Sequence, residues 1–335
     1  MGWPVIRHRK TVSALALAAV ALYALVIDGP VHDLVTNSVP TVVTTDAPEH
    51  GVSGVQPGDT VVYFNGIQGS GLTHSVAIRH TWSRYGSVAV VEYARYRFSA
   101  SDTVRTTFNW LIARHARRVT VIGVSMGGLL ALDLLDMSRI HHSGLILRLI
   151  LQDVPAGATS LKQPGAELTR VLHPGWLLNL VSPQIWSLFG TPTSTALRGS
   201  GANAVQINAD DHDTLTWPVS CFTQQLRYII TRALPAPGAY ADIPMVYVQS
   251  TLDSTVSNDS TYWLSVFGSH RLVNVVGTHS GLVAYPDAYR AGYIRAFGLF
   301  PPWALSSPSS ASSAKSPVAQ TYLGFSFGVE LKCSG

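Results

Sequence analysis

Ser125 lies in a string whose residue types and order suit nucleophilic catalysis. Residues 123–128 read Gly-Val-Ser-Met-Gly-Gly; a strand-like apolar run (118–123) leads into them and an apolar, helix-like run (127–137) follows. In this context the pattern G-x-S-x-G is typical of a sharp strand-to-helix turn that raises a serine oxygen above a sheet. Gly123 and Gly127 leave the space that such a turn needs. Ser125 is therefore predicted to be a nucleophile; the alternative is a glycine-rich helix start with a passive serine.

A serine hydroxyl is a weak nucleophile, so it needs a general base, which in turn needs an acid to orient it. In this type of site the chain order is serine, acid, histidine. Asp253 follows an apolar run at 243–250, and His279 follows another at 271–277. We expect His279 to be the general base and acid, and Asp253 to orient it. Asp153, which also follows a strand-like run, is the alternative acid.

An acyl-transfer site also needs two N–H donors for the oxyanion that develops on the substrate. Met126, the residue after the nucleophile, should supply one. The glycine-containing loop 65–71 should supply the other at Ile67, with Gln68 as the alternative. This loop lacks the G-K-[ST] ending of a phosphate-binding loop, and no dinucleotide fingerprint is present, so neither nucleotide-binding motif is indicated.

No metal site is expected either. Residues 210–213 read Asp-Asp-His-Asp, which offers ligand atoms. Consecutive residues cannot all face one ion, however, and no partner motif accompanies them. A solvated loop is the preferred interpretation.

The elements that would position these residues alternate along the chain. Short Val/Ile/Leu-rich runs typical of buried strands lie at 61–66, 87–93, 118–123, 147–153, 243–250 and 271–277. Helical segments are predicted between them at 73–85, after a cap at Ser101-Asp102, and at 127–137. Continuous apolar strands separated by helices indicate a mostly parallel sheet covered on both faces, which is the three-layer α/β class. Active sites in such sheets lie at the carboxyl ends of strands.

With these residues in place, the chain resembles the α/β-hydrolase superfamily over roughly residues 58–300. The resemblance rests on the 123–128 string, the Asn65-Gly66 loop, Asp253 and His279. It implies an eight-stranded sheet, a Ser-His-Asp triad and no cofactor. Many members have His-Gly where this chain has Asn65-Gly66.

The same resemblance implies an inserted helical cap at about residues 156–215. This segment contains apolar stretches around residues 172–189. An apolar cap would favour an acyl or lipid-like substrate, because burying apolar surface is favourable by about 25 cal/mol per Å². The alternative is that these side chains simply pack the cap onto the core.

The two ends of the chain differ in composition from its centre. Residues 1–10 carry several basic side chains, and residues 11–27 carry no charge, which predicts a signal anchor or a cleaved signal peptide. The next Lys or Arg after Lys10 is Arg79, so residues 1–10 should stay cytoplasmic and the rest should be extracytoplasmic. A single-pass membrane protein is expected, with secretion after cleavage as the alternative. Residues 28–57 are interpreted as a linker, and residues 301–335 as a disordered tail rich in Ser and Pro.

Composition restricts the function further. Of 335 residues, 13% are charged and the net charge is +4, without a long basic block, so we expect no nucleic-acid partner. Two cysteines, Cys221 and Cys333, cannot build a disulfide scaffold or a zinc cluster. The sequence thus predicts a serine hydrolase that cleaves a small-molecule carboxylic ester. An acyltransferase on the same triad and a non-catalytic surface binding protein with this fold are the alternatives.

Overall fold

A computed structural model describes residues 39–47, 55–67, 71–94, 98–162, 219–279, 281–301 and 303. Three regions singled out above therefore fall wholly or mostly outside the described residues: the apolar segment 11–27, the cap insert beyond Lys162, and the tail. Residues 1–300 and residues 301–335 are separate units, and every element below belongs to the first. In the part of the chain that is described, no helix is both long and apolar enough to cross a membrane.

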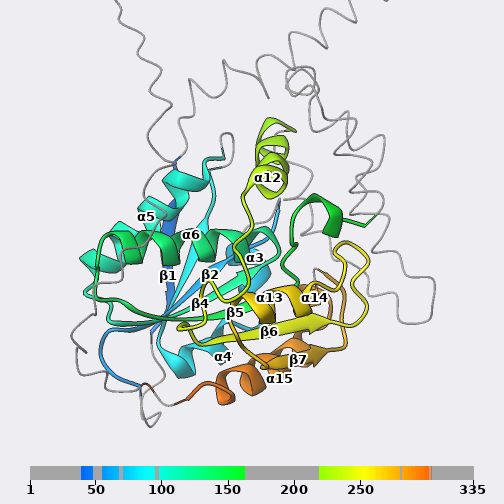
Figure 1. Ribbon diagram of the computed structural model, residues 1–335. Helices are drawn as coiled ribbons and strands as arrows, with labels where there is room; N and C mark the ends of the chain where they lie inside the picture. Colours follow the sequence, from blue (N-terminus) through cyan, green and yellow to red (C-terminus); the bar gives the residue numbers. More distant parts are fainter. Residues whose placement is uncertain are drawn as a thin grey trace, which may run out of the picture. The chain divides into compact units, whose positions relative to one another are not determined.

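Seven strands form one sheet (Figure 1). In spatial order they are β1 (Thr41–Asp46), β3 (Ser87–Glu92), β2 (Asp59–Phe64), β4 (Arg118–Val124), β5 (Ile146–Gln152), β6 (Met245–Ser250) and β7 (Leu272–Val275). All neighbouring pairs are parallel except β1 and β3, which are antiparallel. The predicted α/β class is confirmed. The described residues supply seven strands, whereas the resemblance implied eight.

The first strand corrects the predicted linker at 28–57. Thr41–Asp46 pairs with β3 from Thr41 opposite Glu92 to Asp46 opposite Val88. Its Val and Thr side chains are half-buried or exposed, as suits an edge strand. The run was missed because its register with β3 depends on residues about fifty positions away. The ordered domain thus begins before residue 58.

Helices cover both faces of the sheet. One face packs against α5 (Ala100–Ala113), α6 (Met126–Ile140), α12 (Val219–Thr231) and α13 (Ser260–Val266). The other packs against α4 (Arg79–Trp82), α14 (Gly281–Ala284) and α15 (Pro286–Gly298). The central strands are apolar on both sides for this reason: β2 and β6 are buried along their whole length. The sheet is therefore a rigid platform for the loops at its carboxyl end.

Two predicted helices differ in detail from the structure. The predicted helix 73–85 is divided into α3 (Gly71–Ser75), α4 and a 3-10 turn, Ser83–Tyr85. The Ser83 hydroxyl bonds to His80 O at 2.7 Å, a local contact that competes with helical hydrogen bonding. The α5 cap is Ser99, whose side chain accepts from Asp102 N, and not the predicted Ser101-Asp102 pair.

Candidate active site

Ser125 occupies a tight turn between β4 and α6. Its backbone has φ 53° and ψ −124°, a left-handed conformation that is strained for a residue with a side chain. Its N–H donates to Gln152 O on β5 at 2.8 Å, which ties the turn to the neighbouring strand. The Ser125 residue is only 6% exposed. The fold therefore holds one serine in a strained position at the carboxyl end of the central strand.

The glycines around Ser125 are required by close backbone approach. A Cβ on Gly123 would lie 2.5 Å from Gly128 Cα, and a Cβ on Gly127 would lie 2.3 Å from Phe64 O. Both distances are shorter than real carbon contacts, so the steric reason inferred from the sequence agrees with the structure. Gly128 is similarly restricted, because its Cβ would lie 2.1 Å from Val154 Cγ2.

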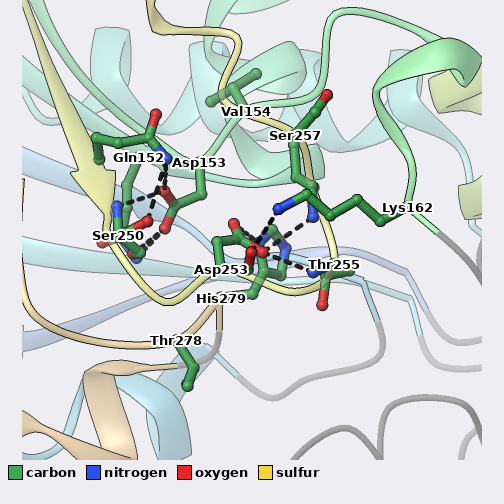
Figure 2. A network of polar contacts seen from close by, with 12 residues as sticks. Gln152, Asp153, Val154, Lys162, Ser250, Asp253, Thr255, Ser257, Thr278 and His279 are labelled. Atoms are coloured by element: carbon green, nitrogen blue, oxygen red, sulfur yellow. Dashed lines mark hydrogen bonds and ion pairs between the residues drawn. The ribbon is translucent and has the colours of Figure 1, made fainter.

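His279 and Asp253 form a hydrogen-bonded pair on the loops after β7 and β6. His279 Nδ1 lies 2.8 Å from Asp253 Oδ2 (Figure 2). The other carboxylate oxygen, Oδ1, accepts the N–H groups of Thr255 at 2.7 Å and Val256 at 2.9 Å. Both side chains are largely buried, at 14% and 3% exposure. These contacts fix the imidazole and leave its other nitrogen, Nε2, for chemistry.

The charges of this pair reinforce each other. Burial favours neutral His279, but the Asp253 charge and hydrogen bond outweigh it, with a contribution from Asp153, and raise the pKa of His279 above its usual range. Burial alone would raise the pKa of Asp253, yet His279 and the two backbone N–H groups hold that pKa below its usual value. Asp253 is therefore an anion that can stabilise an imidazolium.

Asp153, the alternative acid, lies beside the pair but is bonded differently. Ligand atoms of Asp153, Asp253 and His279 lie within 4.8 Å of one another. Asp153 Oδ1 accepts the N–H of Ser250 at 2.8 Å, and Oδ2 contacts the Ser250 hydroxyl. No hydrogen bond joins Asp153 to His279 among the described residues. The structure therefore favours Asp253 as the partner of His279. These three groups also have the types and the spacing of metal ligands.

The loop after β2 lies directly against the nucleophile. A Cβ on Gly66 would be 3.3 Å from Ser125 Cβ and 3.8 Å from its Oγ. The Asn65 side chain positions this loop, because its Oδ1 accepts from Tyr63 OH at 2.9 Å and lies 3.1 Å from His74 Nδ1. Tyr93 OH donates to the Asn65 carbonyl. Ile67 follows Gly66 and is half-buried, while Gln68 lies outside the described residues.

Met126 is the first residue of α6, and the first N–H groups of a helix have no partner within the helix. The predicted donors Met126 and Ile67 thus come from the two segments that flank Ser125. Ser125 and His279 are placed at the same sheet edge, although no hydrogen bond joins them within the described chain. Such bonds often tighten only when a substrate binds.

Lys162 is one residue that the sequence analysis missed. Its Nζ donates to the Asp253 carbonyl at 2.6 Å, and its N–H donates to Thr255 O at 2.9 Å (Figure 2). A bridge between Leu161 and Val256 continues this contact. The described start of the predicted cap segment (about 156–215) is therefore attached to the loop that carries Asp253. No local sequence signal could reveal a contact across 91 residues.

Comparison with solved structures gives many matches. A marine microorganism esterase has a TM-score of 0.52 at 14% identity, covering 77% of this chain and 99% of its own. This chain has the α/β-hydrolase fold. The type II thioesterase of the borrelidin biosynthetic cluster matches with a TM-score of 0.53 at 17% identity over 76% of this chain and 96% of its own. A bacterial membrane phospholipase A matches with a TM-score of 0.51 at 16% identity over 86% and 96%.

Identities this low establish the α/β-hydrolase fold and not the reaction. At the level of sequence, neither a protein-family model nor a curated protein matches the chain. The chemistry must therefore be argued from the site itself.

Proposed function

We propose that the protein is a serine hydrolase that cleaves a carboxylic ester through Ser125, His279 and Asp253. The observation that carries the proposal is that the strained Ser125 turn and the hydrogen-bonded His279–Asp253 pair both lie at the carboxyl ends of the strands. Packing alone does not explain a serine in this strained turn, because a glycine would fit the turn without strain. Esterases among the structural neighbours agree with this reaction class.

The reaction follows from the positions of these groups. His279 Nε2 takes the hydroxyl proton as Ser125 Oγ bonds to the acyl carbon, and the carbonyl electrons move onto oxygen. The Met126 and Ile67 N–H groups stabilise that oxyanion. Asp253 stabilises the imidazolium, which then protonates the departing alcohol. Water, deprotonated by His279, attacks the acyl-enzyme and releases the carboxylic acid and free Ser125.

A fluorophosphonate probe tests the proposal, because it labels only an activated serine. We expect the full-length protein in detergent to be labelled and Ser125→Ala to be unlabelled. Turnover of short aryl esters should fall by more than about a thousandfold in the same variant. Ser138→Ala is the matched control, since Ser138 is also buried and its hydroxyl is hydrogen-bonded to that of Ser143 at 2.7 Å, away from the site.

Labelling that persists in Ser125→Ala would contradict the proposal, as would a folded wild-type protein that resists the probe and the esters. Product analysis with added alcohol shows whether the acyl group passes to water, as proposed, or to the alcohol.

A further inference from the structure

A second set of buried polar groups lies beside the His279–Asp253 pair and reaches the backbone of the His279 loop. It runs from the Asp153 carboxyl to the Ser250 hydroxyl, then to the Tyr289 hydroxyl, and ends at the carbonyl of Thr278. Tyr289 OH lies 2.7 Å from that carbonyl oxygen. Thr278 directly precedes His279 in the chain. Figure 2 shows Asp153 and Ser250 together above the Asp253–His279 pair, and Thr278 below the pair.

The number of hydrogen atoms available to this series of hydrogen bonds bears on whether Asp153 is protonated. Three contacts join the four groups, and each contact needs one hydrogen. Ser250 and Tyr289 bring one hydroxyl hydrogen each, and the Thr278 carbonyl brings none. The third hydrogen must come from the Asp153 carboxyl. With Asp153 as an anion, Ser250 would donate to it, and Tyr289 could serve only one of Ser250 and Thr278.

We propose that Asp153 works as a neutral carboxylic acid that starts a one-directional hydrogen-bond chain and thereby positions the His279 loop. Asp153 donates to Ser250, Ser250 donates to Tyr289, and Tyr289 donates to the Thr278 carbonyl. The other Asp153 oxygen accepts the Ser250 N–H. Asp153 is then a positioning residue that acts on His279 through Ser250 and Tyr289. This inference rests on the proposed function for its kinetic effects only.

The surroundings of Asp153 support a held proton. Burial raises the pKa of Asp153 to about 6; the Asp253 charge adds to the rise, while His279 and the hydrogen bonds from Ser250 oppose it. The amides of Gln152 and Gln249 also donate to the carboxyl, at 3.3 and 3.4 Å. The other titratable groups near it are tyrosines: Tyr247 on β6, and Tyr289 and Tyr293 on α15. Lys162, the cationic side chain at this site, donates to the Asp253 carbonyl and acts on the charge of His279. With the anion Asp253 already paired to His279, a second anion here would be unfavourable.

The pH dependence of stability follows with a definite sign. The folded-state pKa of Asp153 is raised from 3.8 to about 6, so the folded protein binds more protons than the unfolded chain in between. Stability from this group is full below about pH 4 and is lost as the pH rises through about 6. An asparagine has no proton to lose. Its amide N–H can donate to Ser250 while its carbonyl accepts the Ser250 N–H. Asparagine also tolerates the left-handed φ of 48° at this position.

The test compares Asp153→Asn, Asp153→Ala and Tyr289→Phe with the wild-type protein. We expect Asp153→Asn to gain thermal stability relative to wild type by a few degrees between pH 5 and pH 8. At pH 5, below the pKa of Asp153, it should keep kcat within about threefold of wild type, because its amide preserves the hydrogen bonds to Ser250. Asp153→Ala and Tyr289→Phe should each lower kcat by about tenfold with KM little changed, because the His279 loop loses its anchor.

Tyr240→Phe is the matched control. Tyr240 also bonds its hydroxyl to a carboxylate, that of Asp136 at 2.8 Å, and its ring contacts in the described part of the chain are to Phe267 and Arg139, outside the His279 loop. It should lower stability without lowering kcat.

Two outcomes would overturn the inference. A stability difference between Asp153→Asn and wild type that is the same at pH 5 and pH 8 would show that Asp153 holds no extra proton. A kcat for Asp153→Asn at pH 5 as low as that for Asp153→Ala would show that Asp153 acts as an anion. The thermal measurement needs no turnover, so it decides the inference even if Ser125-dependent catalysis is absent.

Discussion

At the scale of single residues, the site depends on two carboxylates with different duties. Asp253 faces His279 and is surrounded by N–H donors, so it stays ionised. Asp153 is buried, which raises its pKa although the Ser250 hydroxyl and N–H oppose the rise. The pKa values of two neighbouring acids thus shift in opposite directions: burial raises that of Asp153, whereas His279 and the backbone N–H groups lower that of Asp253. Lys162 adds a cation that opposes protonation of His279.

Lys162→Met tests that cation. Removing its charge should raise the pKa of His279 further, since the Lys162 charge lowers it. Only neutral His279 can act as a base, so the acid limb of kcat/KM should move to higher pH. The loss of the hydrogen bond to the Asp253 carbonyl should cost about tenfold or less on the alkaline plateau. A pH profile of ester hydrolysis measures both effects.

Lys162→Arg, which keeps the charge, is the control and should leave the acid limb in place. An acid limb that stays unmoved in Lys162→Met would show that the cation does not reach His279.

At the scale of elements, α6 must approach β2 and β5 closely enough to hold Ser125 above the sheet. The approach is made at glycines: Gly127 against the backbone of β2, and Gly128 against the Val154 side chain. The two contacts differ in kind. A backbone carbonyl cannot move aside, whereas a valine side chain can be shortened. The position of α6 can therefore be tested by adding a methyl group at Gly128 and then shortening the Val154 side chain that it would meet.

Gly128→Ala should destabilise the protein by about 1–3 kcal/mol, because the new methyl group would overlap Val154. Adding Val154→Ala should recover part of that loss, so that the double variant is more stable than the sum of the single changes by about 1 kcal/mol. Urea unfolding measures these free energies. Gly298→Ala is the control, because nothing lies within 4 Å of its Cβ position. Strict additivity of the two changes would contradict the packing at this contact.

At the scale of the whole molecule, the described domain is one α/β-hydrolase sheet with helices on both faces, preceded by a stretch that the structure does not describe. The uncharged residues 11–27 and the basic residues before them still predict attachment to a membrane. We propose a single-pass protein whose catalytic domain is extracytoplasmic. A site outside the cytoplasm would meet ester substrates from outside the cell or in the membrane.

Replacing Leu15 and Leu17 by arginine tests this attachment. Each arginine costs about 2.5–3.5 kcal/mol at the centre of a spanning helix, so the double variant should leave the membrane fraction on alkaline carbonate extraction. The wild-type chain should stay in that fraction at full length. A shorter wild-type chain in the medium would instead support the cleaved signal peptide. Replacing two residues of the 28–38 stretch is the control and should change nothing.

The sequence by itself determined the α/β class and the turn around Ser125, and it predicted Asp253 and His279 as the acid and base that follow in the chain. These features depend on local signals: apolar runs of strand length, glycines on either side of a serine, and polar residues just after strands. It left Asp253 and Asp153 both open as partners of His279, because each follows a strand and both carboxylates reach the same edge. It also missed β1, Lys162 and the chain through Ser250 and Tyr289. Only the tertiary structure decides these, because each depends on groups that meet from distant parts of the chain and on the direction in which single hydrogen bonds point.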